Sequence, residues 1–261
     1  MASNSHSKIW AWLLSFFGLL LACGDIPRDN PLDPKNPDSY CAQKIVIEAF
    51  VNTGNPYPYN QYMLVALDSL ADLYPEQLVI AEYHRNTEQY LDSLHLNENE
   101  LLYQHYLQVL GSSLKAVPDV FINGVEQHVQ GASSVQSALF RLQQAVLSDF
   151  TKNSYFTMEL SYQLHGTKII PVVTLARLGR EEATNILLKA IIIARQDELY
   201  HKRTVRGSTK SGLIPTLSPG DFKTIELPEL EIDAVDPCSL IVYVVDKNER
   251  TIYQSDSLPV E

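Results

Sequence analysis

Side chains suited to thiol, metal or nucleophile chemistry are few in this chain and widely scattered. Its three cysteines, Cys23, Cys41 and Cys238, are too few for a disulfide framework and lack the spacing of a zinc site. His84 closes a short apolar run and is a candidate site residue, although a lone histidine there is more often packed or solvated. The other histidines show no metal-ligand spacing, and no glycine-rich phosphate loop or serine nucleophile motif occurs. The sequence therefore predicts no catalytic residue, no metal and no small-molecule cofactor.

Composition and charge exclude a further class of function, nucleic-acid binding. The chain has 261 residues, of which 45% are hydrophobic, and its formal net charge is −11. Lys8 is the only charged residue before Cys23, which leaves 19 basic against 31 acidic residues and a net charge of −12 for the remainder. Phosphate backbones require clustered Lys and Arg, so nucleic acid is excluded as an expected partner.

The first 23 residues read as an export signal that ends in an anchor. Lys8 gives the positive flank, and the apolar run 9–22 is too short to span a bilayer, which needs about 20 residues. The run ends in Leu-Leu-Ala before Cys23, which resembles the bacterial lipobox, whose cysteine is acylated. The alternatives are a plain cleaved signal or an uncleaved anchor. Acylation of Cys23 would tether the body to a membrane, so we expect a cell-envelope lipoprotein of the outer membrane, on its periplasmic or surface face.

Residues 24–42 read as a tether. Four prolines occur between Asp25 and Tyr40, with almost nothing to bury. Because proline fixes φ and favours an extended predecessor, the segment is expected to be a stiff polyproline-like spacer. Its acidic residues lack the pattern of a calcium loop.

Residues 43–150 alternate between strand and helix patterns. The expected order is strand, helix, strand, helix, two hairpin strands and a last helix, over 44–51, 59–73, 78–83, 98–110, 119–122, 125–129 and about 134–147. Asn97 is the expected cap of the helix over 98–110, with Glu100 at the capping-box position. Residues 151–261 show only strand patterns, over 155–164, 168–176, 185–194, 240–245 and 251–255, which predict an immunoglobulin-like β-sandwich.

The turn after the first strand is Thr-Gly-Asn-Pro-Tyr-Pro-Tyr, residues 53–59. It resembles the thioredoxin active-site turn, with Asn55 and Pro58 at the positions of the two cysteines. The run Val117-Pro118-Asp119 resembles the cis-proline loop of the same family. Neither an amide nor an imino ring can act as a thiolate, so thiol–disulfide exchange at this turn is excluded.

Together these motifs are similar to a family of thioredoxin-like outer-membrane lipoproteins of Gram-negative bacteria, in which such a domain precedes a β-sandwich. The resemblance covers residues 43–255 and implies an α/β thioredoxin-like domain followed by an all-β immunoglobulin-like sandwich. It also implies that the residue before the cis-proline offers its backbone to an extended peptide. The residues expected to contact such a peptide are Asn55, Pro56, Tyr57, Pro58, His84, Val117 and Pro118.

Three functions remain open. The first is a redox-inactive, non-enzymatic protein that binds a peptide or protein partner or serves a structural role. The second is an oxidoreductase that uses displaced cysteines, Cys41 and Cys238, which form either a disulfide across the two halves or two separate thiols. The third is a surface adhesin that acts through the sandwich.

Overall fold

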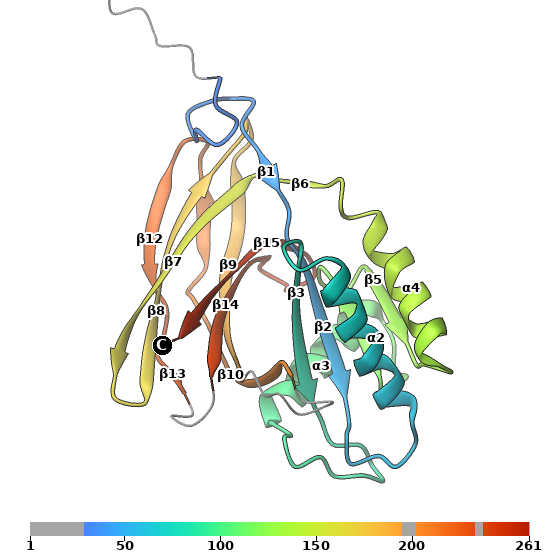
Figure 1. Ribbon diagram of the computed structural model, residues 1–261. Coiled ribbons are helices and arrows are strands. Elements are labelled where there is room, and N and C mark those ends of the chain that lie inside the picture. Colours follow the sequence, from blue (N-terminus) through green and yellow to red (C-terminus); the bar gives the residue numbers. More distant parts are fainter. Residues whose placement is uncertain (1–28, 195–201, 233–236, 261) are drawn as a thin grey trace, which may run out of the picture.

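The computed structural model describes residues 29–194, 202–232 and 237–260 (Figure 1). In its first half, a strand–helix–strand–helix segment is followed by a hairpin and a covering helix. These elements are β2 (Ile45–Val51), α2 (Tyr59–Leu73), β3 (Leu78–His84), α3 (Asn97–Leu110), β4 (Asp119–Ile122), β5 (Gln127–Gln130) and α4 (Val135–Leu147). The Ser134 side chain caps α4 by accepting a hydrogen bond from the Ser137 N–H.

The second half contains strands joined by turns. They are β7 (Phe156–His165), β8 (Lys168–Arg177), β9 (Ala183–Ala194), β10 (Thr204–Lys210), β11 (Ile214–Leu217), β12 (Phe222–Glu226), β13 (Leu230–Glu231), β14 (Cys238–Asp246) and β15 (Ile252–Val260). A short antiparallel pair of β1 (Cys41–Ala42) and β6 (Asn153–Ser154) joins the segment just before β2 to the segment just after α4.

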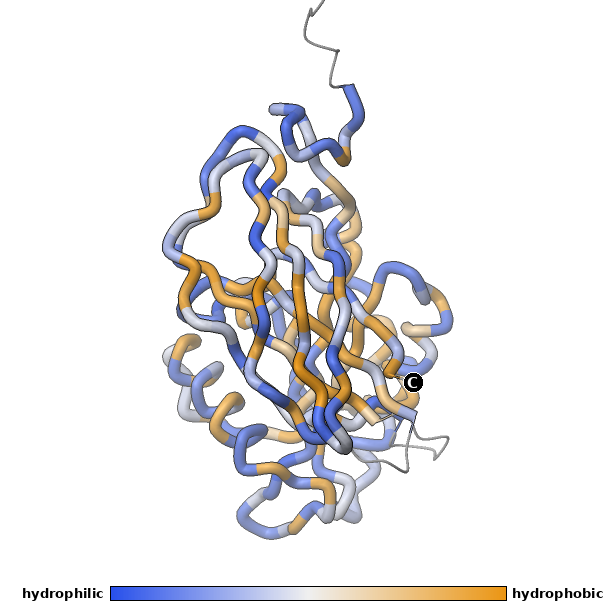
Figure 2. The backbone as a smooth tube through the Cα atoms, turned by 90° about the vertical axis from the view of Figure 1, so that its left-hand side faces the viewer, coloured by the Kyte–Doolittle hydropathy of each residue, from blue (hydrophilic) through white to orange (hydrophobic). Residues whose placement is uncertain are grey.

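One mixed sheet runs through both halves of the chain. Its order is β15-β14-β9-β10-β3-β2-β4-β5, with β11 also paired to β9. The connection between the halves is the parallel contact of β10 with β3, at Thr204 and Glu82. A second sheet of β7, β8, β12 and β13 packs against the distal part of the first. Figure 2 shows apolar and polar residues alternating along these strands, as expected where one face is buried.

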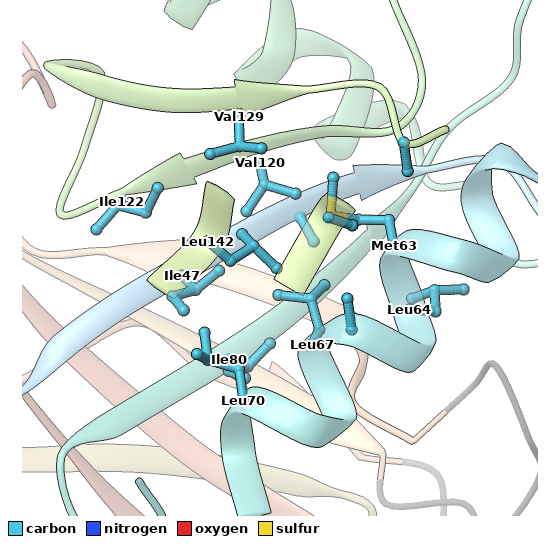
Figure 3. Packing of buried hydrophobic residues seen from close by; sticks show 14 of the residues in the cluster. Ile47, Met63, Leu64, Leu67, Leu70, Ile80, Val120, Ile122, Val129 and Leu142 are labelled. Carbon is cyan, nitrogen blue, oxygen red and sulfur yellow. The ribbon is translucent and has the colours of Figure 1, made fainter. Parts of the chain in front are cut away.

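Three apolar cores hold the layers together. In the first, the apolar face of α2 packs with Leu142 of α4 on the first-half strands, as Figure 3 shows for Met63, Leu67 and Ile80. The third fills the space between the two sheets of the second half. The second core is mixed, because Phe50 and Tyr103 from the first half pack with residues such as Ile191 and Tyr243 from the second. Side chains on both sides of residue 150 therefore share one interior.

The expected fold class is wrong. Strand residues outnumber helical residues by roughly two to one in the described chain, so the protein is mainly β. It is not an α/β thioredoxin-like domain followed by a separate all-β sandwich, since the sheet crosses from one half to the other through β3 and β10. The sequence analysis predicted no strand at β10, β11, β12 or β13. The pairing of β10 with β3 is long-range and left no local signal.

The tether also differs from the expected extended spacer. Residues 30–39 form three successive turns instead, each closed by a backbone hydrogen bond between residues three apart. An Asn or Asp side chain begins every turn by accepting the N–H two residues later. These side-chain acceptors select turns over the extended geometry that proline alone would permit.

Candidate functional site

A groove of about 780 Å³ opens at the end of the first-half strands where β2 and β3 finish. Three segments line it: the turn between β2 and α2, the long connection that follows β3, and the approach to β4. The lining residues are Asn55, Tyr57, 85–90, His95, Glu100, Ser113 and 115–117. Of the candidate peptide contacts, Asn55, Tyr57 and Val117 line the groove, whereas Pro56, Pro58, His84 and Pro118 do not.

The β2–α2 turn forms an aromatic lip. The Asn55 side chain accepts a hydrogen bond from the Tyr57 N–H at 3.0 Å, and Pro56 and Tyr57 are exposed. The Tyr57 ring stacks on Tyr59 at 5.9 Å between centroids and meets Tyr90 edge-on at 6.4 Å. Pro58 precedes α2, and its carbonyl accepts the Tyr62 N–H at 2.9 Å. Since neither Asn55 nor Pro58 carries sulfur, the lip offers contact surface and no redox group.

The approach to β4 supplies an open backbone edge. The Val117–Pro118 bond is cis, as predicted. Pro118 is buried, and its carbonyl accepts the Gly131 N–H at 2.7 Å. Val117 lines the groove, and its own N–H and C=O make no hydrogen bond to the part of the chain that the structure describes. An unpaired backbone donor and acceptor beside a groove can pair with an added extended strand.

His84 does not line the groove, unlike the expectation. It is fully buried, and its Nδ1 lies 3.0 Å from Asp92 Oδ2. Asp92 also accepts the Thr53 N–H at 2.7 Å, which links the β2–α2 turn to the connection after β3. Burial alone would raise the pKa of Asp92, but the hydrogen bond and charge of His84, with the N–H groups of Leu94 and Thr53, lower that pKa to about 2. Asp92 thus joins two walls of the groove, and His84 holds the Asp92 carboxylate in place.

The groove floor contains an ion cluster that the sequence reasoning missed. Arg85 is almost fully buried, lies 4.0 Å from the centre of the Tyr103 ring, and pairs with Glu100 at 2.7 Å. Lys115 pairs with the other Glu100 oxygen at 2.9 Å. Burial raises the pKa of Glu100, but Gln104, Lys115 and Arg85 outweigh it and lower the pKa. Glu100 therefore links the connection after β3 to the approach to β4. The expected capping box does not form, because the residue at the N-cap position of α3 is Leu96 and no side chain caps the helix. The sequence carried no signal for this cluster, because its members are separated by turns of unpredictable path.

Gly54 marks a close approach between two of these walls. A Cβ built on it would lie only 1.9 Å from the Leu91 carbonyl oxygen. The connection after β3 therefore rests directly on the β2–α2 turn, and a side chain at this position would push them apart.

The two remaining cysteines do not meet. Neither forms a disulfide; Cys41 lies in β1, where Gln254 donates to its sulfur at 3.2 Å, and Cys238 begins β14. Gln254 pairs with Val244, which lies six residues from Cys238 along β14, or roughly 20 Å. That spacing exceeds the Cα separation of at most about 7 Å that a disulfide tolerates. Neither thiol lines the groove.

The described residues have neither the pattern of a metal site nor that of a membrane-spanning helix. Within the described ranges, no group of three His, Cys, Asp or Glu residues is arranged to hold a metal ion. Among the helices of these same ranges, none is long and apolar enough to cross a bilayer. Cys23, the expected lipidation site, lies outside the described residues.

Comparison with known proteins shows similarity of fold alone. No family model matches the chain, and no curated protein matches it. The crystal structure of protein AGR_C_4864 from Agrobacterium tumefaciens is 19% identical, with a TM-score of 0.53 over 83% of this chain and 94% of that one. HBP35 of Porphyromonas gingivalis is 13% identical, with a TM-score of 0.63 over 84% of this chain and 76% of that one. Both alignments extend across the two halves, which agrees with one continuous, mainly β architecture.

Proposed function

We propose that this chain is a lipid-anchored cell-envelope protein that binds an extended segment of a peptide or protein partner in the groove, without catalysing a reaction. The observation that carries the proposal is the unpaired backbone of Val117 on the wall of a 780 Å³ groove. An added strand would satisfy both of its polar groups, so backbone hydrogen bonds would supply affinity independent of the partner's sequence.

The remaining lining suits the side chains of such a segment. Tyr57 and Tyr90 offer large, rigid faces that bury area at low entropic cost. Asn55 and Gln89 offer neutral donors and acceptors beside them. The charged groups on the floor are already paired with one another, which favours a partner segment of neutral, mixed character over a highly charged one.

The enzymatic alternative receives no support from the positions of the thiols. An oxidoreductase with displaced cysteines needs two sulfurs that can form a disulfide, and Cys41 and Cys238 lie too far apart for that. The adhesin alternative rests on no specific contact or surface described above. Anchoring through acyl groups on Cys23 remains part of the proposal and rests on the lipobox-like residues before it.

Binding of a permanently unfolded polypeptide, reduced and alkylated so that it cannot fold, tests the proposal by fluorescence anisotropy. Tyr57→Ala removes the centre of the aromatic lip and is expected to weaken binding about tenfold, which is ~1.4 kcal/mol. Tyr40→Ala is the matched control, because Tyr40 is similarly exposed on the tether and should leave the affinity unchanged. Equal losses in both variants, or no binding by the unmodified protein at high concentration, would refute the groove as a peptide site.

A further inference from the structure

The tether contains a three-residue repeat with a regular structure. Asn30, Asp33 and Asn36 are each followed by proline, and each side-chain oxygen accepts the N–H two residues later at 2.9, 2.9 and 3.0 Å. The backbone carbonyl of each accepts the N–H three residues later, at 3.1, 2.9 and 3.0 Å. The Tyr40 N–H returns to the Pro31 carbonyl at 2.9 Å and closes the segment on itself. Residues 30–40, called the brace below, are thus a compact spiral of turns.

The brace is fixed to one end of the two packed sheets of the second half, which are called the sandwich below. The Ser39 side chain is fully buried, and its oxygen accepts the Gly179 N–H at 2.9 Å. Asp38 pairs with Arg180 in the same loop. The Pro34 carbonyl lies only 3.4 Å from the position of a Cβ on Gly220, so the brace also rests on the neighbouring turn. Figure 1 shows this segment seated on the loops at the top of the sandwich.

The groove lies at the opposite end of the molecule. The strand β9 begins at Ala183, just after the loop that holds the brace, and ends at Ala194. Eleven residue steps along a strand span roughly 36 Å. Ala194 pairs with Thr204, which pairs with Glu82, three residues before the groove wall starts at Arg85. The brace and the groove are therefore separated by the length of β9 (Figure 1).

From this arrangement we infer that the brace sets the orientation of the body on the membrane, with the sandwich end facing the lipid surface and the groove pointing away from it. The inference rests on the proposed anchor at Cys23. Only six residue steps separate Cys23 from Asp29, and a chain of that length reaches at most about 20 Å. A free spacer of the full tether would let the body turn over, whereas a docked brace holds one end close to the bilayer.

Energy transfer to acceptor-labelled lipids tests the orientation on vesicles of neutral phospholipid. A donor is placed, as an unnatural amino acid, at Lys35 in the brace or at Glu88 on the groove rim, and the mature acylated chain is reconstituted. Transfer from position 35 is expected to be about twofold or more stronger than from position 88, because the two sites differ by roughly 35 Å in height. Equal transfer from both positions, or stronger transfer from position 88, would overturn the inference.

A brace variant and a separate anchor measurement complete the test. Replacing Asn30, Asp33 and Asn36 with alanine removes all three side-chain acceptors and is expected to abolish the difference between the two donor positions. Asp29→Ala, which removes a tether acid outside the turns, should preserve that difference. A difference that survives the triple substitution would contradict the role of the brace.

The same pair of donors is also measured on a chain whose Cys23 carries a synthetic maleimide lipid, with Cys41→Ser to prevent a second label. This preparation is anchored whether or not the cell acylates Cys23, so it tests the orientation alone. Mass spectrometry of the protein extracted from membranes tests the anchor alone. An unacylated Cys23 would refute the proposed anchor, and an orientation lost on the synthetic lipid would refute the brace.

Discussion

A buried ion pair joins the two halves of the chain. Glu48 of β2 and Lys189 of β9 lie 3.1 Å apart, with side chains only 1% and 3% exposed. The carboxylate also accepts hydrogen bonds from the Tyr83 and Tyr106 hydroxyls at 2.9 and 2.5 Å. The ammonium group lies over the rings of Tyr83 and Tyr243 at 5.4 and 5.7 Å. Each charge therefore depends on a partner from the other half.

Glu48→Gln is expected to destabilise the whole protein by about 3–5 kcal/mol, because it leaves a buried ammonium without a counter-charge. Adding Lys189→Met to that variant removes the stranded charge, so the double variant should lose about 1–3 kcal/mol less than the sum of the single variants. Lys44→Met is the matched control, since its ion pair with Asp256 is more than one-third exposed and contributes at most about 1 kcal/mol.

Urea unfolding measures these differences. Both tryptophans precede Cys23, so circular dichroism is used to follow the helices, which in the described part of the chain lie between residues 59 and 147. Segment-resolved hydrogen exchange follows the strands after residue 153. The shared core predicts coincident midpoints for both signals in every variant, and Glu48→Gln should lower both together. A variant that shifts the helical signal alone would refute the reasoning, as would a Glu48→Gln effect no larger than that of the control.

Three further predictions concern the groove walls and the tether. Gly54→Ala should lower the free energy of unfolding in urea by about 2–3 kcal/mol and weaken peptide binding, because its Cβ would clash with the Leu91 carbonyl. Gly212→Ala is the control, because a Cβ there meets open space, and it should change the free energy of unfolding by less than about 0.5 kcal/mol. Folding lowers the pKa of Asp92 from 3.8 to about 2, so this residue should contribute on the order of 1–2 kcal/mol to the free energy of unfolding above pH 4, and this contribution is lost as the pH falls toward 2. Asp92→Asn should remove this part of the pH dependence. A free energy of unfolding that falls equally with acid in the variant and the unmodified protein would contradict the prediction. The amide protons of residues 32–39 that close the turns should exchange at least tenfold more slowly than in an unstructured peptide of the same sequence, and equal rates would show that no brace forms.

Local features of the fold were predictable from the sequence. The helix over 59–73 and the strand over 119–122 have the expected bounds, because their apolar spacing and flanking turn residues act over a few positions. The cis bond before Pro118 also agrees with the expectation. These features depend on interactions between near neighbours in the chain.

The features that decided the architecture are long-range. Lys189 lies in an apolar strand and would be read as a solvent-facing residue, yet it is buried because Glu48 lies opposite it across the fold. Likewise His84 sits at the expected strand end but turns into the interior toward Asp92. The conformation of the tether was hard to predict for a different reason. Its Asx-Pro repeat was present in the sequence, but proline is compatible with both an extended spacer and a turn, and the side-chain acceptors of Asn30 and its counterparts decide between them.

The most direct test of peptide binding at the groove is the exchange rate of the Val117 amide proton. Its neighbours do not interfere, because the Ala116 N–H already bonds to the Tyr103 hydroxyl and Pro118 has no N–H. Saturation with the unfolded polypeptide is expected to slow Val117 exchange at least tenfold, since an added strand would accept this hydrogen bond. An unchanged rate at saturation would contradict the claim that a partner's backbone pairs with Val117.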